Sequence, residues 1–195
     1  PFHEMAHAWT ANYFGDDTPK NSGRLSFNPL VHLDIFGSLL LLVAGFGWAK
    51  PVPVNPGTLR KHSRYANMLV SLAGPSTNFA MAILAAIPIR LGLVKFQGFS
   101  SGFTFPSLFE FLFYFIITNI LLMVFNLIPI APLDGEKVLE FFIPDALLPT
   151  FNKIKQYGPI LLIILLFVLP RFGFDIIGAI MNPIVQFLLT FLVGA

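Results

Sequence analysis

Residues 65–89, YANMLVSLAGPSTNFAMAILAAIPI, form the stretch that decides the fold of this 195-residue chain. At about 1.5 Å per helical residue, the stretch is long enough to cross the roughly 30 Å hydrocarbon core of a bilayer. Its centre, Ala73-Gly74-Pro75-Ser76-Thr77-Asn78, is a patch of small residues that allows a neighbouring helix to approach closely. The stretch therefore predicts a membrane-spanning helix packed against other helices.

The composition of the whole chain agrees with a membrane protein. Hydrophobic residues make up 55% of the sequence and charged residues 11%, well below the roughly one quarter that is usual in soluble domains. The mean hydropathy is +0.76. The net charge of +2 and the lack of aromatic–basic interleaving give no indication of nucleic-acid binding. Because cysteine is absent, any bound metal must be held by His, Asp or Glu side chains.

Other apolar runs flank the first one. A second full span is predicted at 108–127, and a short amphipathic stretch then reaches about Lys155. The runs at 160–169 and 176–193 are either two spans or a helical hairpin. The run at 35–48 is short for a full span and suits a re-entrant segment equally well. These runs predict an all-α polytopic membrane protein.

Two segments are predicted to lack regular helix. Residues 16–32 are polar and are expected to form a loop. Residues 47–56, GWAKPVPVNP, contain three prolines within six positions and must therefore be extended. An extended segment could pair with the backbone of an unfolded substrate strand, but spacing alone favours a rigid connector.

Basic residues predict the orientation in the membrane. Between the spans 65–89 and 108–127, the only basic residues in the sequence are Arg90 and Lys95. The positive-inside rule therefore directs the 90–105 loop outward, and the proline-rich segment and the 129–156 region toward the cytoplasm. The basic residues on the cytoplasmic side are Lys20, Arg24, Lys50, Arg60, Lys61, Arg64, Lys137, Lys153 and Lys155.

The first seven residues, Pro1-Phe2-His3-Glu4-Met5-Ala6-His7, contain an HExxH pattern. On a helix, His3 and His7 lie one turn apart on the same face, so both imidazoles can reach one zinc ion. Glu4 lies beside them, where it can take a proton from a zinc-bound water. The alternative is an ordinary helix with two unconnected histidines. Since the pattern stands so near the first residue, which is not Met, we expect a fragment with further helical residues before His3.

Asp134 is the strongest candidate for the third ligand that a catalytic zinc requires. It follows the 108–127 span and a segment broken by two prolines, and it precedes Gly135. A carboxylate at membrane depth is costly unless it pairs with a cation, and irregular backbone there is tolerated where it lines a wet cavity. The alternative role for Asp134 is to cap a helix that begins at Glu136. The other candidates are the remaining Asp and Glu residues, His32 and His62.

The remaining polar residues give weaker indications. His32 and Asp34 could support a metal site or form a second one, although a loop histidine near an aspartate is more often structural. His62 lies among basic residues and is expected to be solvated. Glu110 is expected to be a helix-start charge that the helix dipole favours.

Two motifs, His3-Glu4-Met5-Ala6-His7 and Asn126-x2-Pro129-x2-Pro132-Leu133-Asp134-Gly135, together resemble the site-2 protease family of intramembrane zinc metallopeptidases. The segments 47–56 and Ser26-Phe27-Asn28-Pro29-Leu30 look like those of its compact bacterial and archaeal members. The motifs lie within residues 1–135, and residues 136–195 match as extra hydrophobic segments alone.

The resemblance implies one Zn²⁺ per chain, held by His3, His7 and Asp134, with Glu4 as the general base. It implies a single membrane-embedded peptidase domain over 1–195. The catalytic core of this domain would cover about 1–140, and its C-terminal helices would cover 157–195.

The resemblance also implies a role for two asparagines. Asn126 would hold the substrate backbone, and the 65–89 helix would be the middle of a three-helix catalytic core. Asn78 on that helix would be a polar contact near the site or a hydrogen bond to another helix. The implied activity is hydrolysis of transmembrane or membrane-proximal peptide bonds in membrane-protein substrates. The expected location is the prokaryotic cell membrane, as a multi-pass protein; assembly into a homo-oligomer is left open.

Two rival functions account for part of the pattern. A membrane transporter or ion-binding protein could use His3, His7 and Asp134 as a transit site, but it would give Glu4 no role. A catalytically inactive relative acting as a scaffold would have no reason to keep all four residues.

Overall fold

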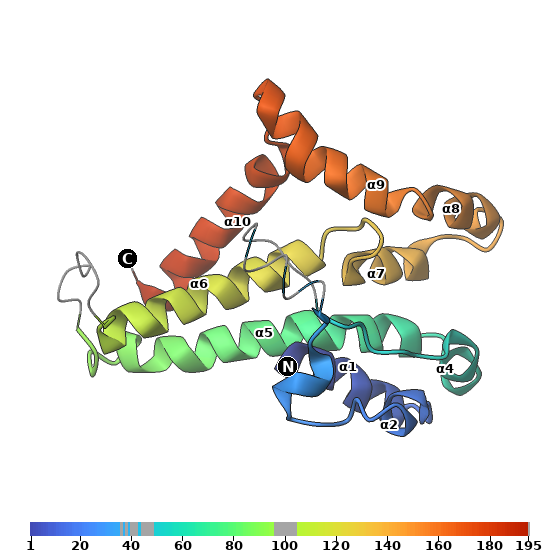
Figure 1. Cartoon of the computed structure of the whole chain (residues 1–195), viewed down its shortest axis with the longest axis horizontal. Helices are drawn as coiled ribbons and strands as arrows, with labels where there is room; N and C mark the ends of the chain where they lie inside the picture. Colours follow the sequence, from blue (N-terminus) through green and yellow to red (C-terminus); the bar gives the residue numbers. More distant parts are fainter. Residues whose placement is uncertain (36, 38, 40–42, 44–48, 96–104, 195) are drawn as a thin grey trace. The chain divides into compact units, whose positions relative to one another are not determined.

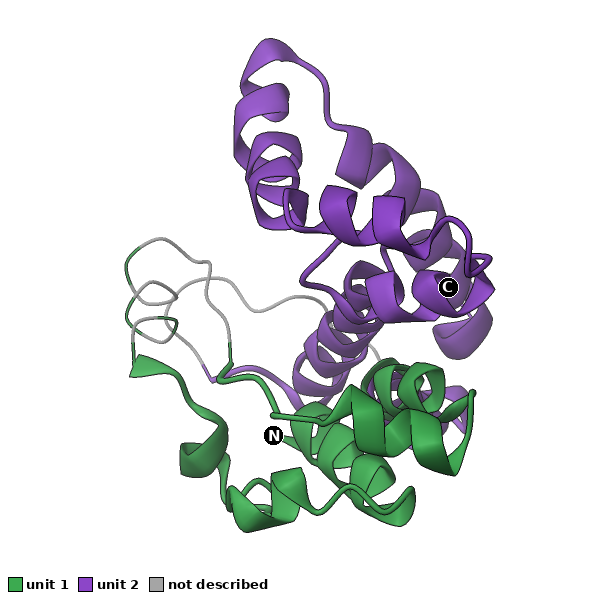
Figure 2. Cartoon of the chain, turned by 90° about the vertical axis from the view of Figure 1, so that its right-hand side faces the viewer, with its two compact units in different colours: residues 1–77 green, residues 78–195 purple. Residues whose placement is uncertain are grey.

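The computed structural model describes every residue of the chain except 36, 38, 40–42, 44–48, 96–104 and 195 (Figure 1). The described residues are mainly helical, with one isolated antiparallel bridge between Leu33 and Ala49. They divide into two compact units, residues 1–77 and 78–195 (Figure 2). The predicted all-α fold is therefore confirmed. Most of the apolar run at 35–48 and of the loop at 90–105 lies outside the described residues.

The first unit is built around a small apolar core. Ala11, Leu59, Ala66 and Val70 are buried and form one cluster. They bring together three helices that are separated in the sequence. The elements of this unit are α1 (Phe2–Tyr13), α2 (Thr18–Asn21), the 3-10 helix η1 (Pro29–His32), α4 (Pro56–His62) and residues 66–77 of α5 (Ala66–Arg90).

The prediction of a loop over residues 16–32 is wrong for α2 and η1. Each short helix has a proline in its first turn, Pro19 in α2 and Pro29 in η1. A proline at this position costs little, since the first N–H groups of a helix have no partner within the helix. Residues 50–55 are in neither helix nor strand, as their prolines predict. The prediction of an extended segment over 47–56 is wrong for Pro56, which is the first residue of α4.

The second unit contains a larger apolar core between α5, α6 and α10. Helices α6 and α10 pack against each other, and residues 78–90 of α5 contribute Ala82 and Ala86. The buried partners of these alanines are Ile116, Ile120, Val124, Ile177, Met181, Val185 and Leu192. The elements after α5 are α6 (Leu108–Asn126), α7 (Asp134–Phe142), α8 (Leu148–Lys155), α9 (Gly158–Ile163), the π-helical η2 (Ile164–Val168), η3 (Leu169–Phe172) and α10 (Ile176–Val193).

Three of the described helices, α5, α6 and α10, are long and apolar enough to cross a membrane. The helical stretch from α8 to η3 makes a fourth candidate if its two parts, bent by 52°, count as one span. The predicted spans at 65–89 and 108–127 correspond to α5 and α6. Large side chains such as Phe111, Tyr114 and Phe187 are more than half exposed, as expected for surfaces that contact lipid.

Candidate metal centre

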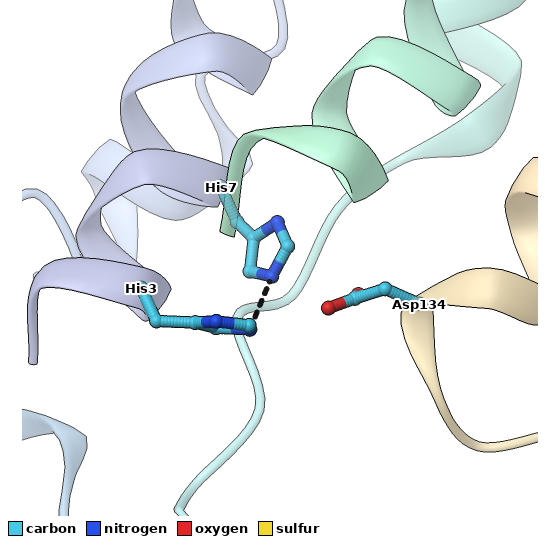
Figure 3. A group of neighbouring side chains, drawn as sticks. All are labelled: His3, His7 and Asp134. Carbon is cyan, nitrogen blue, oxygen red and sulfur yellow. Dashed lines mark hydrogen bonds between the residues drawn. The ribbon is translucent and has the colours of Figure 1, made fainter. Parts of the chain in front are cut away.

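Helix α1 holds the two histidines of the HExxH pattern in contact with each other. His3 and His7 are one helical turn apart, and their Nε2 atoms lie 3.0 Å apart (Figure 3). His7 is buried, with 8% of its surface exposed. The imidazoles are therefore not unconnected, as the plain-helix alternative would have them.

A backbone carbonyl of α5 orients the ring of His7. Nδ1 of His7 lies 2.6 Å from the carbonyl oxygen of Val70. Because a carbonyl oxygen can only accept, Nδ1 carries the proton and donates it. The lone pair of His7 is then on Nε2, the nitrogen that faces His3. Metal-ligating histidines are commonly held by a hydrogen bond of this kind.

Gly74 provides the space that the two rings occupy. A Cβ atom at position 74 would lie 2.4 Å from Nε2 of His7 and 2.6 Å from Nε2 of His3. Both distances are well inside van der Waals contact, so any larger residue at position 74 would displace the rings. The small-residue patch of α5 therefore admits the imidazoles of α1. Sequence reasoning assigned this patch to the approach of a neighbouring helix and missed its relation to the histidines.

Asp134 stands at the point where the proline-broken segment enters α7. It is the first residue of α7 and is 9% exposed, and Leu133 occupies the N-cap position. The alternative prediction, that Asp134 caps a helix beginning at Glu136, is therefore wrong. Gly135 allows the tight entry into α7, because a Cβ there would lie 2.3 Å from the carbonyl oxygen of Leu127.

Among the described residues, His3, His7 and Asp134 are the group of side chains that could hold a metal ion (Figure 3). The group offers two imidazole nitrogens and one carboxylate oxygen. Zinc accepts these donors, and three protein ligands leave its fourth position open for water or substrate. The donor chemistry and the space over Gly74 both fit the metal that the sequence predicts.

The general base predicted by the motif is also on α1. Glu4 is partly buried and lies in the first turn of the helix, directly after His3. A carboxylate in a first turn is favoured by the helix dipole. Glu4 therefore belongs to the same helix as both histidines.

The two predicted substrate-binding asparagines lie in the long helices. Asn126 is the last residue of α6, and its Nδ2 donates to the carbonyl oxygen of Leu122 at 2.9 Å. This bond orients the side-chain amide at the end of the helix. Asn78 lies within α5 and is 1% exposed.

Asp16, one of the other carboxylate candidates, has a structural role. Its Oδ1 accepts from the backbone N–H of Thr18 at 3.1 Å and from the hydroxyl of Thr18 at 2.5 Å. Its Oδ2 accepts from the backbone N–H of Asn55 at 2.6 Å. Asp16 is 2% exposed, and it ties the start of α2 to the end of the proline-rich segment.

His32 and Asp34 likewise hold local structure. Nε2 of His32 donates to the carbonyl oxygen of Ser26 at 2.8 Å, and the carboxylate of Asp34 accepts from the N–H of Gly37 at 2.8 Å. These contacts agree with the structural interpretation of the pair.

His62 and Glu110 have the surroundings that the sequence predicts. His62 is exposed, as expected, and its ring lies 5.6 Å from that of Phe14. Glu110 acts at the start of a helix, where it forms a reciprocal pair of capping hydrogen bonds with Ser107.

Comparisons with known proteins identify the family of this chain. Residues 92–169 match Peptidase family M50. The chain is 42% identical over 172 residues to YwhC of Bacillus subtilis, which is named as a zinc metalloprotease. That match covers 86% of this chain and 75% of the relative. No solved structure matches the chain.

Two more distant relatives carry the same kind of name. Rip2 of Mycolicibacterium smegmatis is 31% identical over 184 residues, which cover 90% of this chain and 66% of that protein. MJ0611 of Methanocaldococcus jannaschii is 31% identical over 144 residues, which cover 72% of this chain and 64% of that protein. Both are named as zinc metalloproteases. The chain belongs to peptidase family M50, the site-2 protease family, and is a zinc metalloendopeptidase.

Proposed function

We propose that this protein is an intramembrane protease that cleaves transmembrane or membrane-proximal peptide bonds of membrane-protein substrates. One zinc ion would be held by His3, His7 and Asp134, with Glu4 as the general base. The observation that carries the proposal is the convergence of the two imidazole Nε2 atoms over Gly74, at a separation of 3.0 Å.

The spacing of the two imidazoles supports a shared metal. Two nitrogen ligands bound tetrahedrally at about 2.0–2.1 Å from zinc lie about 3.4 Å apart. The observed 3.0 Å between the Nε2 atoms differs from this by an amount that a small ring rotation supplies. Bound zinc would polarise the substrate carbonyl and lower the pKa of its water toward neutrality.

The residues of the chain supply orientation and proton transfer. The carbonyl of Val70 fixes the tautomer of His7, so that Nε2 presents its lone pair to the metal. Glu4 takes a proton from the attacking water and returns it to the leaving amine. The burial of His7 and Asp134 limits competing contact with bulk water.

Substrate recognition follows from the membrane setting. A transmembrane substrate helix must unwind first, because its scissile carbonyl is hydrogen-bonded within the helix. The unwound strand needs polar partners, and the amide of Asn126 and the backbone of residues 50–55 are suited to supply them. We retain a single peptidase domain over 1–195, in a multi-pass protein of the prokaryotic cell membrane, as part of this proposal.

The test compares the protein in lipid nanodiscs with its Glu4→Gln variant. Metal analysis is combined with cleavage of a model transmembrane substrate. Glu4→Gln should keep zinc and cleave slower by roughly 10²- to 10⁴-fold, the usual contribution of general acid–base catalysis. Chelation should abolish cleavage by the wild type, and added zinc should restore it.

Two results would contradict the proposal. The first is a Glu4→Gln variant that cleaves at the normal rate. The second is zinc flux through proteoliposomes that depends on the histidines and Asp134 but not on Glu4, together with an absence of proteolysis. That second result would favour the transporter.

A further inference from the structure

Lys155, at the C-terminal end of α8, bridges two carboxylates of α7. Its Nζ lies 3.1 Å from Oε1 of Glu136 and 2.8 Å from Oε2 of Glu140. Glu136 and Glu140 are four residues apart and therefore lie on one face of α7, one turn from each other. A single amine thus holds two successive turns of a helix that has nine residues.

The bridge is largely shielded from solvent. The side chains of Glu136 and Glu140 are 8% and 12% exposed, and that of Lys155 is 31% exposed. The ring of Phe151 lies 5.7 Å from Nζ and covers the amine further. Fully exposed ion pairs contribute little, whereas loss of one partner of a shielded pair leaves a charge without compensation. The position of Lys155 therefore constrains that of α7.

A second contact joins the same part of the chain to the segment before Asp134. Gly158 begins α9 and packs against Ala131, since a Cβ at position 158 would lie 2.5 Å from the carbonyl oxygen of Ala131. Ala131 belongs to the proline-broken turn that leads into Asp134. Within residues 155–158, Gly158 thus contacts the backbone before Asp134, and Lys155 contacts the helix that begins at Asp134.

We propose that residues 155–158 position the Asp134 carboxylate for the metal, with Lys155 as the positioning residue. This inference rests on the proposed function, in which Asp134 is a zinc ligand. A helix as short as α7 takes its axis and rotation from few contacts, and Asp134 is its first residue. Groups that orient a metal ligand typically contribute about 10- to 100-fold to metal affinity. The C-terminal region then has a role in the site.

The experiment measures zinc affinity of the purified protein by competition with a chelator. Lys155→Met keeps the apolar stem and removes the charge, and it should weaken zinc binding about tenfold or more. Lys155→Arg keeps the charge and should restore most of the affinity. Lys153→Met is the matched control, because Lys153 is exposed on the same helix, and it should bind zinc as the wild type does.

A milder variant covers the case in which Lys155→Met fails to fold. Glu140→Gln removes one carboxylate charge while keeping the shape of the side chain, and it should weaken zinc binding about threefold or more. If Lys155 acts through Glu140, the two substitutions are not independent. The fold-loss of zinc affinity in the double variant should then be smaller than the product of the fold-losses in the two single variants. Thermal unfolding of the metal-free proteins checks that each variant is folded.

The outcomes separate this inference from the proposed function. Wild-type zinc affinity in both Lys155→Met and Glu140→Gln would overturn the positioning role, as would a Lys155→Arg variant as weak as Lys155→Met. Asp134→Asn tests the ligand set itself. If Asp134→Asn loses zinc and the Lys155 variants do not, the positioning role alone fails. If Asp134→Asn binds zinc normally, the proposed ligand set fails.

Discussion

Gly74→Ala tests the metal site by adding one methyl group beneath the two imidazoles. The new carbon would lie 2.4 Å from Nε2 of His7 and 2.6 Å from Nε2 of His3. Since ordinary carbon–nitrogen contacts begin at about 3.4 Å, the ring of His7 must retreat by about 1 Å, and that of His3 by slightly less. The hydrogen bond from His7 to Val70 opposes this movement.

The movement is large compared with what a metal site tolerates. Ligand distances in a zinc site are held to about ±0.2 Å, so a shift of about 1 Å is roughly five times that tolerance. Loss of a group that merely orients a ligand already costs about 10- to 100-fold in affinity. Because two ligands are displaced directly, we expect Gly74→Ala to weaken zinc binding by at least about 100-fold.

The fold should survive the same substitution. Alanine is favoured over glycine within a helix by roughly 0.5–1 kcal/mol, and this gain partly offsets the roughly 1–3 kcal/mol that displacement of packed side chains costs, so the metal-free variant should remain folded with a small change in unfolding temperature. Chelator competition measures zinc affinity, and thermal unfolding without metal measures stability. Ser76→Ala is the matched control, since Ser76 is exposed on the same helix. A Gly74→Ala variant with wild-type zinc affinity would refute the arrangement of the rings over residue 74.

Two further substitutions test the structure around the site. Asp16→Ala removes a buried carboxylate that accepts from Thr18 and Asn55, and it should lower the free energy of unfolding by about 2–4 kcal/mol. Unchanged denaturation would count against the link between α2 and the proline-rich segment. Ser107→Ala removes the reciprocal cap with Glu110 and should cost about 1 kcal/mol, whereas Ser107→Thr should keep most of it. Equal losses in the two variants would contradict the capping role.

The long elements could be predicted from the sequence because length and hydropathy are enough to define them. Helices α5 and α6 begin and end within one residue of the predicted spans 65–89 and 108–127. The short helices α2 and η1 could not be predicted in this way. Proline in a sequence usually indicates the end of a helix. It is also tolerated in the first turn, but this can be applied only when the start of the helix is known.

The same distinction applies to the site: its local sequence patterns could be predicted, and its long-range contacts could not. The spacing of His3 and His7 and the LDG segment around Asp134 are local patterns, and the sequence displays them directly. The contacts of His7 with Val70 and Gly74 join residues more than sixty positions apart, and no periodicity encodes them. A glycine within a long apolar helix is a signal of close approach, but it does not say which group approaches.

Glycine at positions 74, 135 and 158 has a common physical explanation. At each position a Cβ would lie within 2.6 Å of a neighbouring atom: an imidazole nitrogen at 74, a backbone carbonyl oxygen at 135 and another at 158. Each glycine lies in or at the start of a helix, where it is less favourable than alanine by up to about 1 kcal/mol. Close packing therefore requires glycine, despite its low helix propensity, at three positions that contact the histidines or the backbone next to Asp134. Conflict between local preference and close packing is expected where geometry serves function, and here it marks the residues that shape the proposed metal site.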